Sequence, residues 1–199
     1  MARYTQNKIA ICFIGLACLF FGCKQNTPQR EPYLFNKEDK DLFQSGDIIL
    51  RKGEGFISQF ICDRLKERIP ISHCGIIIKD ADKLDVIHAL SKDVSEVDGV
   101  QICSFDQFTQ ESEKGSIFVV RYKKDTTALI ASSALYYLRT QKPFDRFFDL
   151  HDSTAFFCSE LPLHILKYHL HKDLAQDQSI PPFSLFLNPN DFAIIYPRQ

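Results

Sequence analysis

The chain has 199 residues, of which 45% are apolar, and this length supports one sizeable hydrophobic core. Its 24 basic and 25 acidic residues nearly cancel, so no charge excess points to nucleic acid or to an anionic surface as a partner. The sequence also lacks a phosphate-cradling glycine loop and a basic stripe with interleaved aromatic residues. It therefore predicts one domain that does not bind nucleic acid.

The amino terminus has the pattern of a secretion signal. Arg3 and Lys8 precede an apolar run over residues 9–21, and Gly22 and Cys23 follow the run. The run is shorter than the roughly 20 residues that span a bilayer as a helix. A permanent transmembrane anchor is therefore the less favoured interpretation.

Residues 19–23 have the sequence Leu-Phe-Phe-Gly-Cys and resemble the cleavage box of bacterial lipoproteins, although leucine is usual at the second position. The resemblance implies that residues 1–22 are removed and that Cys23 is lipidated. The acyl chains would hold the protein at a membrane of the cell envelope, on the periplasmic side or at the outer membrane. Residues 23–32 are polar and contain two prolines, so we expect a tether there and a folded domain over residues 33–199.

Four cysteines remain in the predicted domain: Cys62, Cys74, Cys103 and Cys158. An oxidising compartment would allow them to form two disulfides. No CxxC pair or regular spacing supports a disulfide framework or a closed zinc site, and apolar neighbours around Cys62 and Cys74 are typical of buried thiols. We expect three structural cysteines and one reactive one, and the sequence leaves their disulfide state open.

Hydrophobic periodicity predicts an α+β domain with a mostly antiparallel sheet packed against helices. The segment over residues 117–122 is nearly all apolar, which indicates a strand inside the sheet. A helix capped by Asp125 or Thr126 would run to about Thr140, where Lys142-Pro143 follows. The other expected elements are strands over residues 47–50, 72–79, 84–90, 100–104 and 192–196 and a helix over residues 56–65.

The spacing of two adjacent strands places two histidines on one face of the sheet. A two-residue loop at Asp80-Ala81 would set His73 directly opposite His88. A four-residue loop over residues 80–83 would shift the pairing by two positions and leave His88 diagonal to His73. Side chains alternate between faces with period two, so only a loop of odd length would separate the imidazoles.

The segment over residues 154–161 places Cys158 at the start of a helix, because Leu161 and Ile165 follow it at helical spacing. Free backbone N–H groups at a helix start favour the thiolate and can bind an oxyanion during acyl transfer. Glu160 would oppose this slightly unless it caps the helix, and Pro162 is acceptable only near the first turn.

Three segments together resemble the circularly permuted NlpC-type cysteine hydrolases of the YiiX/YebB-like group, which have a papain-like fold. They are Ser-Gly-Asp-Ile-Ile-Leu at residues 45–50, Ser-His-Cys-Gly-Ile-Ile at 72–77 and Phe-Cys-Ser-Glu-Leu at 157–161. Ordinary papain-like enzymes have the cysteine before the histidine, whereas the permuted members and this chain have the histidine first. The resemblance covers roughly residues 42–168.

Carried over by position, the resemblance makes Cys158 the nucleophile and His73 the general base, and His88 would orient His73. Glutamate is common at the third position in the YiiX group. A histidine there resembles the lecithin retinol acyltransferase-like branch, so the substrate is open. In either branch the thiolate would attack a carbonyl to form an acyl-enzyme, without a cofactor or metal.

Each residue also has a structural interpretation. Cys158 could be a buried thiol beside Phe156 and Phe157, His73 a satisfied core histidine and His88 an exposed strand residue. Three further histidines lack the HExxH pattern or a matched carboxylate or cysteine pair, so they indicate a solvated helix face and not a metal site. These are His164, His169 and His171.

Three functions follow. The first is a cysteine amidase that acts on cell-wall peptides or N-acylated amino acids near the membrane. The second is a lipid acyltransferase or thiol lipase, which His88 and the aromatic content favour. The third is a non-catalytic binding lipoprotein, in which Cys158 would be unreactive.

Overall fold

The computed structural model describes residues 35–125, 128–176, 178 and 180–198. The predicted signal segment, the tether, Cys23 and Thr126 lie outside the described residues. No helix in the described part of the chain has both the length and the apolar character needed to cross a membrane.

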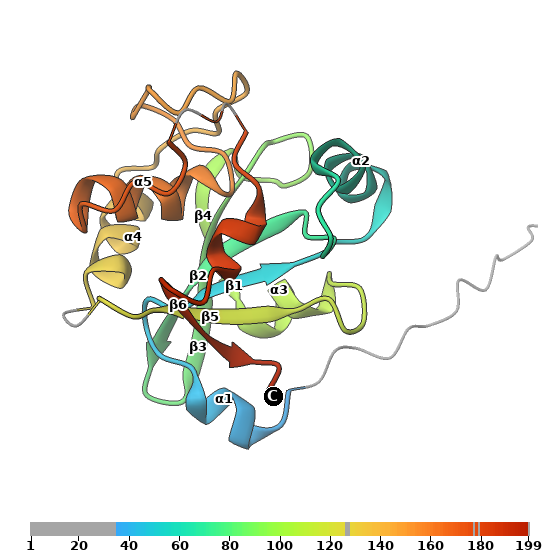
Figure 1. Cartoon of the computed structure of the whole chain (residues 1–199), viewed down its shortest axis with the longest axis vertical. Coiled ribbons are helices and arrows are strands. Elements are labelled where there is room, and N and C mark those ends of the chain that lie inside the picture. Colours follow the sequence, from blue (N-terminus) through green and yellow to red (C-terminus); the bar gives the residue numbers. More distant parts are fainter. Residues whose placement is uncertain (1–34, 126–127, 177, 179, 199) are drawn as a thin grey trace, which may run out of the picture. The chain divides into compact units, whose positions relative to one another are not determined.

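A six-stranded sheet forms the centre of the domain, and each neighbouring pair of strands is antiparallel (Figure 1). The strand order is β4-β3-β2-β1-β5-β6, so the apolar strand β5 lies inside the sheet, as its sequence predicts. The predicted α+β class with an antiparallel sheet is confirmed. The strands are β1 (Ile48–Arg51), β2 (His73–Asp80), β3 (Lys83–Leu90), β4 (Gly99–Ser104), β5 (Phe118–Tyr122) and β6 (Phe192–Tyr196).

The helices expected from periodicity are present, but three short ones were not predicted. The expected helices are α2 (Gly55–Leu65), α4 (Leu129–Arg139) and α5 (Glu160–His169). The Asp125 carboxylate accepts hydrogen bonds from the backbone N–H groups of Leu129 and Ile130, at 2.8 and 3.0 Å, and so stabilises the start of α4. The additional helices are α1 (Lys37–Leu42), α3 (Phe105–Gln110) and the 3₁₀ helix η1 (Phe183–Leu187).

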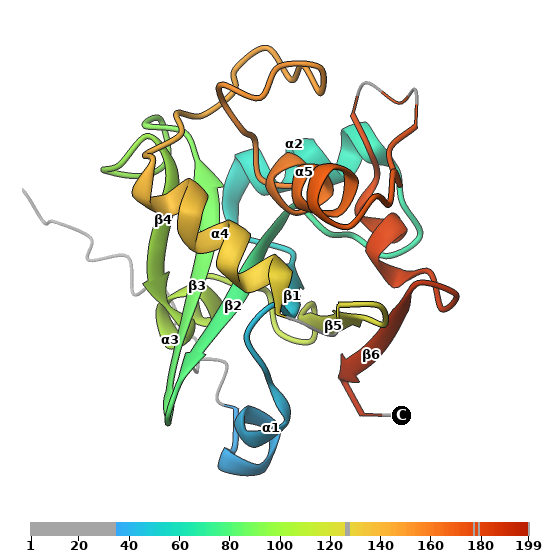
Figure 2. The same ribbon diagram turned by 90° about the vertical axis from the view of Figure 1, so that its left-hand side faces the viewer.

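The two faces of the sheet carry separate hydrophobic cores. Residues of α4, α5 and η1 pack on one face, where Leu50, Cys74 and Ile76 point. Phe105 and Phe108 of α3 pack on the other face, against a second set of strand residues that includes Ile77. Figure 2 shows α4 crossing in front of β2, β3 and β4, with α3 behind the strands. Neighbouring residues of one strand therefore contact different helices.

The β2–β3 hairpin adopts the second of the two predicted registers. Asp80 pairs with Lys83 and Ile76 with Ile87, which leaves Ala81 and Asp82 as a two-residue turn. Ala81 has the left-handed φ of 51° that tight hairpin turns require. His88 is thus diagonal to His73 instead of directly opposite, and the prediction that both share one face is confirmed.

Candidate active site

His73 and His88 are buried and in direct contact. The distance from His73 Nε2 to His88 Nδ1 is 2.9 Å, within hydrogen-bonding range. The register places Gly75 opposite His88, and a Cβ atom at Gly75 would lie only 2.4 Å from Val86 Cγ1 and 3.3 Å from His88 Cβ. A glycine at this position therefore leaves the space in which the two imidazoles meet diagonally.

Arg51 and Phe108 complete what we call the histidine cluster, which consists of His73, His88, Arg51 and Phe108. The Phe108 ring is stacked on His73 with centroids 5.5 Å apart and lies edge-on to His88 at 5.6 Å. The Arg51 guanidinium carbon lies 4.6 Å from the centre of the same ring. One phenylalanine of α3 therefore contacts all three polar side chains.

The Arg51 side chain is only 7% exposed, and Nη2 donates to Glu111 Oε2 at 2.9 Å. Its Nε and Nη1 atoms are buried and have no hydrogen-bond partner among the described residues. Arg51 lies directly opposite His73 in the β1–β2 register. A charge that is incompletely paired in a buried site acts strongly on its neighbours.

Both imidazoles of the cluster are held in the neutral form. Burial, the positive charge of Arg51 and the neighbouring His88 place the pKa of His73 well below its usual value. Burial and Arg51 lower the pKa of His88 to about 3. At neutral pH each imidazole therefore has one N–H group and one nitrogen lone pair, and the ring that donates the bond between them keeps its lone pair free, as a general base requires.

Cys158 lies two residues before α5, in the turn that leads into the helix. The Glu160 Oε2 atom accepts the backbone N–H of Phe157 at 3.1 Å, so Glu160 does stabilise the helix start. Pro162 is the third residue of α5, where its missing N–H costs no helical hydrogen bond. The predicted position of Cys158 near a helix start is confirmed to within two residues.

Cys158 is a partly buried residue, and the pKa of its thiol is lowered. Hydrogen bonding with the Cys74 side chain is the largest cause, and backbone N–H groups, including that of Ser159, add to it. The Cys74 thiol in turn donates to the Cys158 carbonyl oxygen at 3.2 Å. Cys74 follows His73 in β2, so this contact joins the cysteine segment to the histidine strand.

The structure brings His73 and His88 into contact. Cys158 contacts strand β2 through Cys74, on the face of the sheet that α4 and α5 cover. Cys158 packs against the core of α4 and α5, and the hydrogen bonds of the described residues include none from its thiol to either imidazole. Arg51 links the two groups, because its charge interacts with a Cys158 thiolate and with both imidazoles.

The expectation of a solvated histidine face on α5 was wrong for two of the three residues. His164 is only 9% exposed and lies against the Phe156 ring, with centroids 4.8 Å apart. His169 is bonded to the Ser133 hydroxyl and the Tyr137 hydroxyl, each at 3.0 Å. His171 is exposed, as predicted. The error arose because segments distant in the sequence cover α5.

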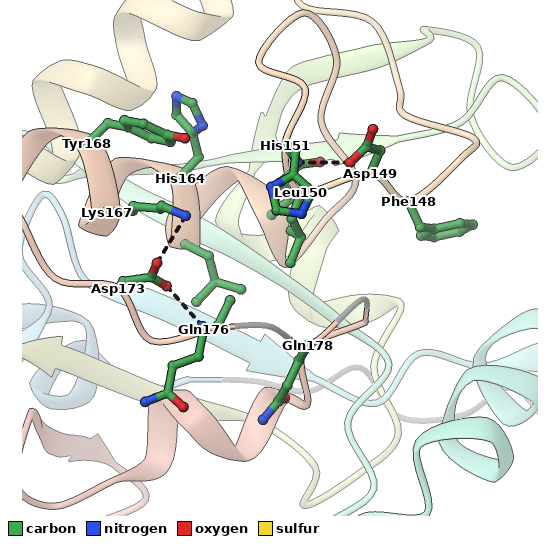
Figure 3. Close-up of a pocket in the computed structure, with 13 residues that line it drawn as sticks. Phe148, Asp149, Leu150, His151, His164, Lys167, Tyr168, Asp173, Gln176 and Gln178 are labelled. Atoms are coloured by element: carbon green, nitrogen blue, oxygen red, sulfur yellow. Dashed lines mark hydrogen bonds and ion pairs between the residues drawn. The ribbon is translucent and has the colours of Figure 1, made fainter.

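A cavity of about 160 Å³ lies where these segments meet α5. Figure 3 shows Lys167 paired with Asp173, His164 and Tyr168 on the helix, and the loop with Asp149 and His151 beside them. Glu160 lines this cavity, but Cys158, His73 and His88 do not. The cavity is therefore separate from the candidate catalytic residues.

Sequence reasoning missed Arg51, Phe108 and the role of Cys74. Arg51 has a detectable signal, because it extends an apolar strand at a position that shares a face with buried Ile49. The Phe108 platform and the contact between Cys74 and Cys158 join segments that are far apart in the chain, and no local pattern indicates them.

Comparisons with known proteins place these observations in a family. Residues 42–185 match the family model described as permuted papain-like amidase enzyme, YaeF/YiiX, C92 family. The crystal structure of the metalloprotein YiiX from Escherichia coli O157:H7 aligns with a TM-score of 0.53 and 24% sequence identity, over 66% of this chain and 68% of that one. No curated protein matches the chain.

The similarity to YiiX shows a shared fold, and the family model covers most of the domain. Within the described ranges of this chain, no group of three or more His, Cys, Asp or Glu side chains is arranged to hold a metal ion. The family description calls these enzymes permuted and papain-like, and in this chain His73 precedes Cys158. The chain belongs to the permuted papain-like amidase enzymes of the YaeF/YiiX, C92 family and is a cysteine hydrolase.

Proposed function

We propose that the protein hydrolyses amide bonds of cell-wall peptides or N-acylated amino acids, with Cys158 as nucleophile, His73 as general base and His88 as the residue that orients His73. The observation that carries this proposal is the bond between His73 and His88, because strand β2, which carries His73, also contacts the cysteine segment through Cys74. A lipid anchor at Cys23 would keep the enzyme at the membrane of the cell envelope.

The tautomers follow from the imidazole bond. A His73 that accepts the thiol proton needs a free lone pair on Nδ1, so its Nε2 carries hydrogen and donates to Nδ1 of His88. His88 then carries its proton on Nε2, which has no hydrogen-bond partner in the part of the chain that the structure describes. His88 would thereby fix the tautomer and the ring orientation of His73, as the third residue does in other catalytic triads.

The reaction would proceed through an acyl-enzyme. His73 takes the proton from Cys158, the sulfur attacks the amide carbonyl, and backbone N–H groups at the start of α5 hold the oxyanion. His73 then gives the proton to the leaving amine as the carbon–nitrogen bond breaks. Water attacks the thioester and releases the acid. Thiol–imidazole contacts in ligand-free enzymes are often long and shorten when substrate binds.

A lipid acyltransferase or thiol lipase is the second candidate. The histidine at position 88 favours it, as do the aromatic side chains exposed on α2. Phe56 is 84% and Phe60 59% exposed, and their rings are stacked with centroids 6.4 Å apart. Such a surface suits an acyl chain or a membrane. In this reaction a second nucleophile would replace water as the acyl acceptor.

The test combines turnover with cysteine labelling. The protein would be incubated with N-acylated amino acids, muropeptides and acyl lipids, and the Cys158 peptide examined by mass spectrometry for an acyl group. We expect Cys158→Ala to abolish turnover and His73→Ala to reduce it by about 10²–10⁴-fold, the usual contribution of a general base. His151→Ala, at an exposed histidine, is the matched control and should retain full activity.

Iodoacetamide labelling across pH gives an independent readout. Cys158 should react well below pH 8.5, the ordinary thiol pKa being about 8.5. Cys103 is an internal reference in the same digest, because burial raises its pKa to about 11. The hydrolase proposal would be lost if Cys158 reacted no faster than Cys103 and Cys158→Ala kept its activity. That result would favour a non-catalytic binding lipoprotein.

A further inference from the structure

Cys74 is a second thiol whose sulfur atom contacts the main chain of Cys158. Cys74 is fully buried on β2, and its Sγ atom lies 3.2 Å from the Cys158 carbonyl oxygen. Burial and the neighbouring Cys158 raise the pKa of Cys74, and the neighbouring Cys74 side chain lowers the pKa of Cys158. Side chains on a strand alternate between faces, so Cys74 points into the core of α4 and α5 while His73 points away from it.

The other cysteines of the described residues have different surroundings. Cys62 lies on α2, and Cys103 packs against the core on the α3 face of the sheet. Neither forms a hydrogen bond with Cys158 within the described part of the chain. Cys74 and Cys158 therefore differ from the remaining cysteines, because they meet although 84 positions separate them in sequence.

We propose that Cys74 and Cys158 are a reversible redox pair, in which a peroxide oxidises Cys158 and Cys74 then captures it as an intramolecular disulfide. The disulfide itself depends only on the contact between the two cysteines. The loss of hydrolase activity that it would cause rests on the proposed function, because it removes the nucleophile.

The two thiols would have different roles. Hydrogen bonding by Cys74 and by backbone N–H groups lowers the pKa of Cys158, a residue that is only partly buried whereas Cys74 is fully buried. Burial raises the pKa of Cys74 well above its usual value. Cys158 is therefore the residue that a peroxide oxidises first, and Cys74 is the resolving thiol.

The chemistry balances in two steps. The Cys158 thiolate attacks one oxygen of hydrogen peroxide, so that an S–O bond forms, the O–O bond breaks and hydroxide leaves. Sulfur is oxidised by two electrons and peroxide is reduced. The Cys74 sulfur then attacks the sulfenic sulfur, forming the S–S bond and breaking the S–O bond. The Cys74 proton leaves with the hydroxyl group as water, and a thiol reductant reverses the oxidation.

The pair would protect the cysteine as well as switch it off. Without a resolving thiol, a sulfenic acid is oxidised further to the sulfinic form, which thiol reductants do not restore. With Cys74 in contact, the disulfide forms before a second peroxide arrives. Activity lost to peroxide should then return when the disulfide is reduced.

The experiment treats the full chain with hydrogen peroxide, blocks free thiols with iodoacetamide and digests it without reduction. We expect mass spectrometry to find one peptide pair joined through Cys74 and Cys158, which disappears on treatment with dithiothreitol. In Cys74→Ala and Cys74→Ser, Cys158 should become sulfinic at peroxide doses that leave the wild type recoverable. Cys103→Ala is the matched control and should form the same linked peptide as the wild type.

Two results would overturn the redox pair: a wild-type Cys158 that becomes sulfinic without a linked peptide, or a disulfide from Cys158 to Cys62 or Cys103. The failure of this inference is distinguishable from that of the proposed function. A linked peptide in a protein whose hydrolysis survives Cys158→Ala leaves the pair standing and removes the hydrolase assignment. Hydrolysis that depends on Cys158 without any linked peptide removes the pair alone.

Discussion

The histidine cluster and the start of α5 lie toward opposite faces of one sheet, and each buries an ionisable group in its neutral form. In the histidine cluster, burial and the charge of Arg51 lower the pKa of His88 to about 3, so the imidazole stays neutral. At the start of α5, burial and the negative charges of Asp145, Asp152 and Asp149 raise the pKa of Glu160 to about 8, so that carboxyl group stays protonated.

The difference matters because a base and an acid that are both held neutral give opposite dependences of stability on pH. Between about pH 3 and 6.5 the unfolded chain protonates His88 and the folded chain does not, so this residue makes folding more favourable as pH rises. Between about pH 4.3 and 8 the folded chain keeps the Glu160 proton and the unfolded chain loses it. This residue makes folding less favourable as pH rises.

The largest expected effect comes from removing the aromatic platform of the histidine cluster. Phe108→Ala should lower the free energy of unfolding by about 3–5 kcal/mol, because Phe108 is 1% exposed and its loss leaves a cavity. Water that enters the cavity would also raise the pKa of His73 and His88. Urea unfolding measures the first effect, and NMR titration of the imidazoles measures the second.

Phe105→Ala is the matched control, since Phe105 is on the same helix and equally buried but contacts Phe35 and Phe43. It should cost similar stability without moving the imidazole pKa values. Phe108→Leu keeps most of the apolar volume and replaces the alanine variant if that one does not fold. Equal titration of the histidines in all three variants would show that the platform does not control their environment.

The second prediction concerns the pH dependence of the unfolding free energy, to which the two regions contribute over different pH ranges. Above about pH 7.5 the histidines are almost entirely neutral in the folded and unfolded chains, so Glu160 controls the slope there. Wild-type protein should lose about 0.5–1 kcal/mol of unfolding free energy between pH 7.5 and 8.5, because the folded chain must then ionise a buried carboxyl group. Glu160→Gln should remove this loss, as measured by urea unfolding at several pH values.

Glu113→Gln is the control for the loss of a carboxylate, because Glu113 is partly exposed and paired with Lys52. It should keep the wild-type slope. A wild-type protein whose stability is flat over this range would contradict a protonated Glu160.

The comparison also explains which parts of the structure the sequence could predict. That His73 and His88 share a face follows from period-two alternation, which survives a register shift of two residues. The register itself depends on Ala81 taking a left-handed φ of 51°, which alanine adopts less readily than glycine or asparagine. Local propensity therefore could not choose between the two pairings.

The surroundings of the site depend on contacts between distant segments. Helix α3 has six residues, too few to show a helical period, yet its Phe108 contacts both imidazoles. Arg51 looks like the polar end of a strand and is buried only because α3 and Glu111, 60 positions away, cover it. His164 appeared solvated for the same reason, since the segments that bury it carry no signal that they fold back onto α5.

The smallest effect tests the one residue that acts on both regions. The charge of Arg51 should favour the Cys158 thiolate and disfavour the protonated imidazoles. In Arg51→Gln the Cys158 thiol pKa should rise, and iodoacetamide labelling at pH 6 should become slower by less than about tenfold, the factor that a full pKa unit would give, because other groups are the main causes of the lowered Cys158 pKa. Arg51→Lys keeps the charge and should recover most of the labelling rate.

Lys52→Gln removes the same charge from the next residue, whose ammonium pairs with Glu113, and should label like the wild type. Slower labelling in Arg51→Gln and Arg51→Lys alike would mean that Arg51 acts through packing against Phe108 and not through its charge. An unchanged rate in both would mean that the histidine cluster and the cysteine segment are electrostatically independent.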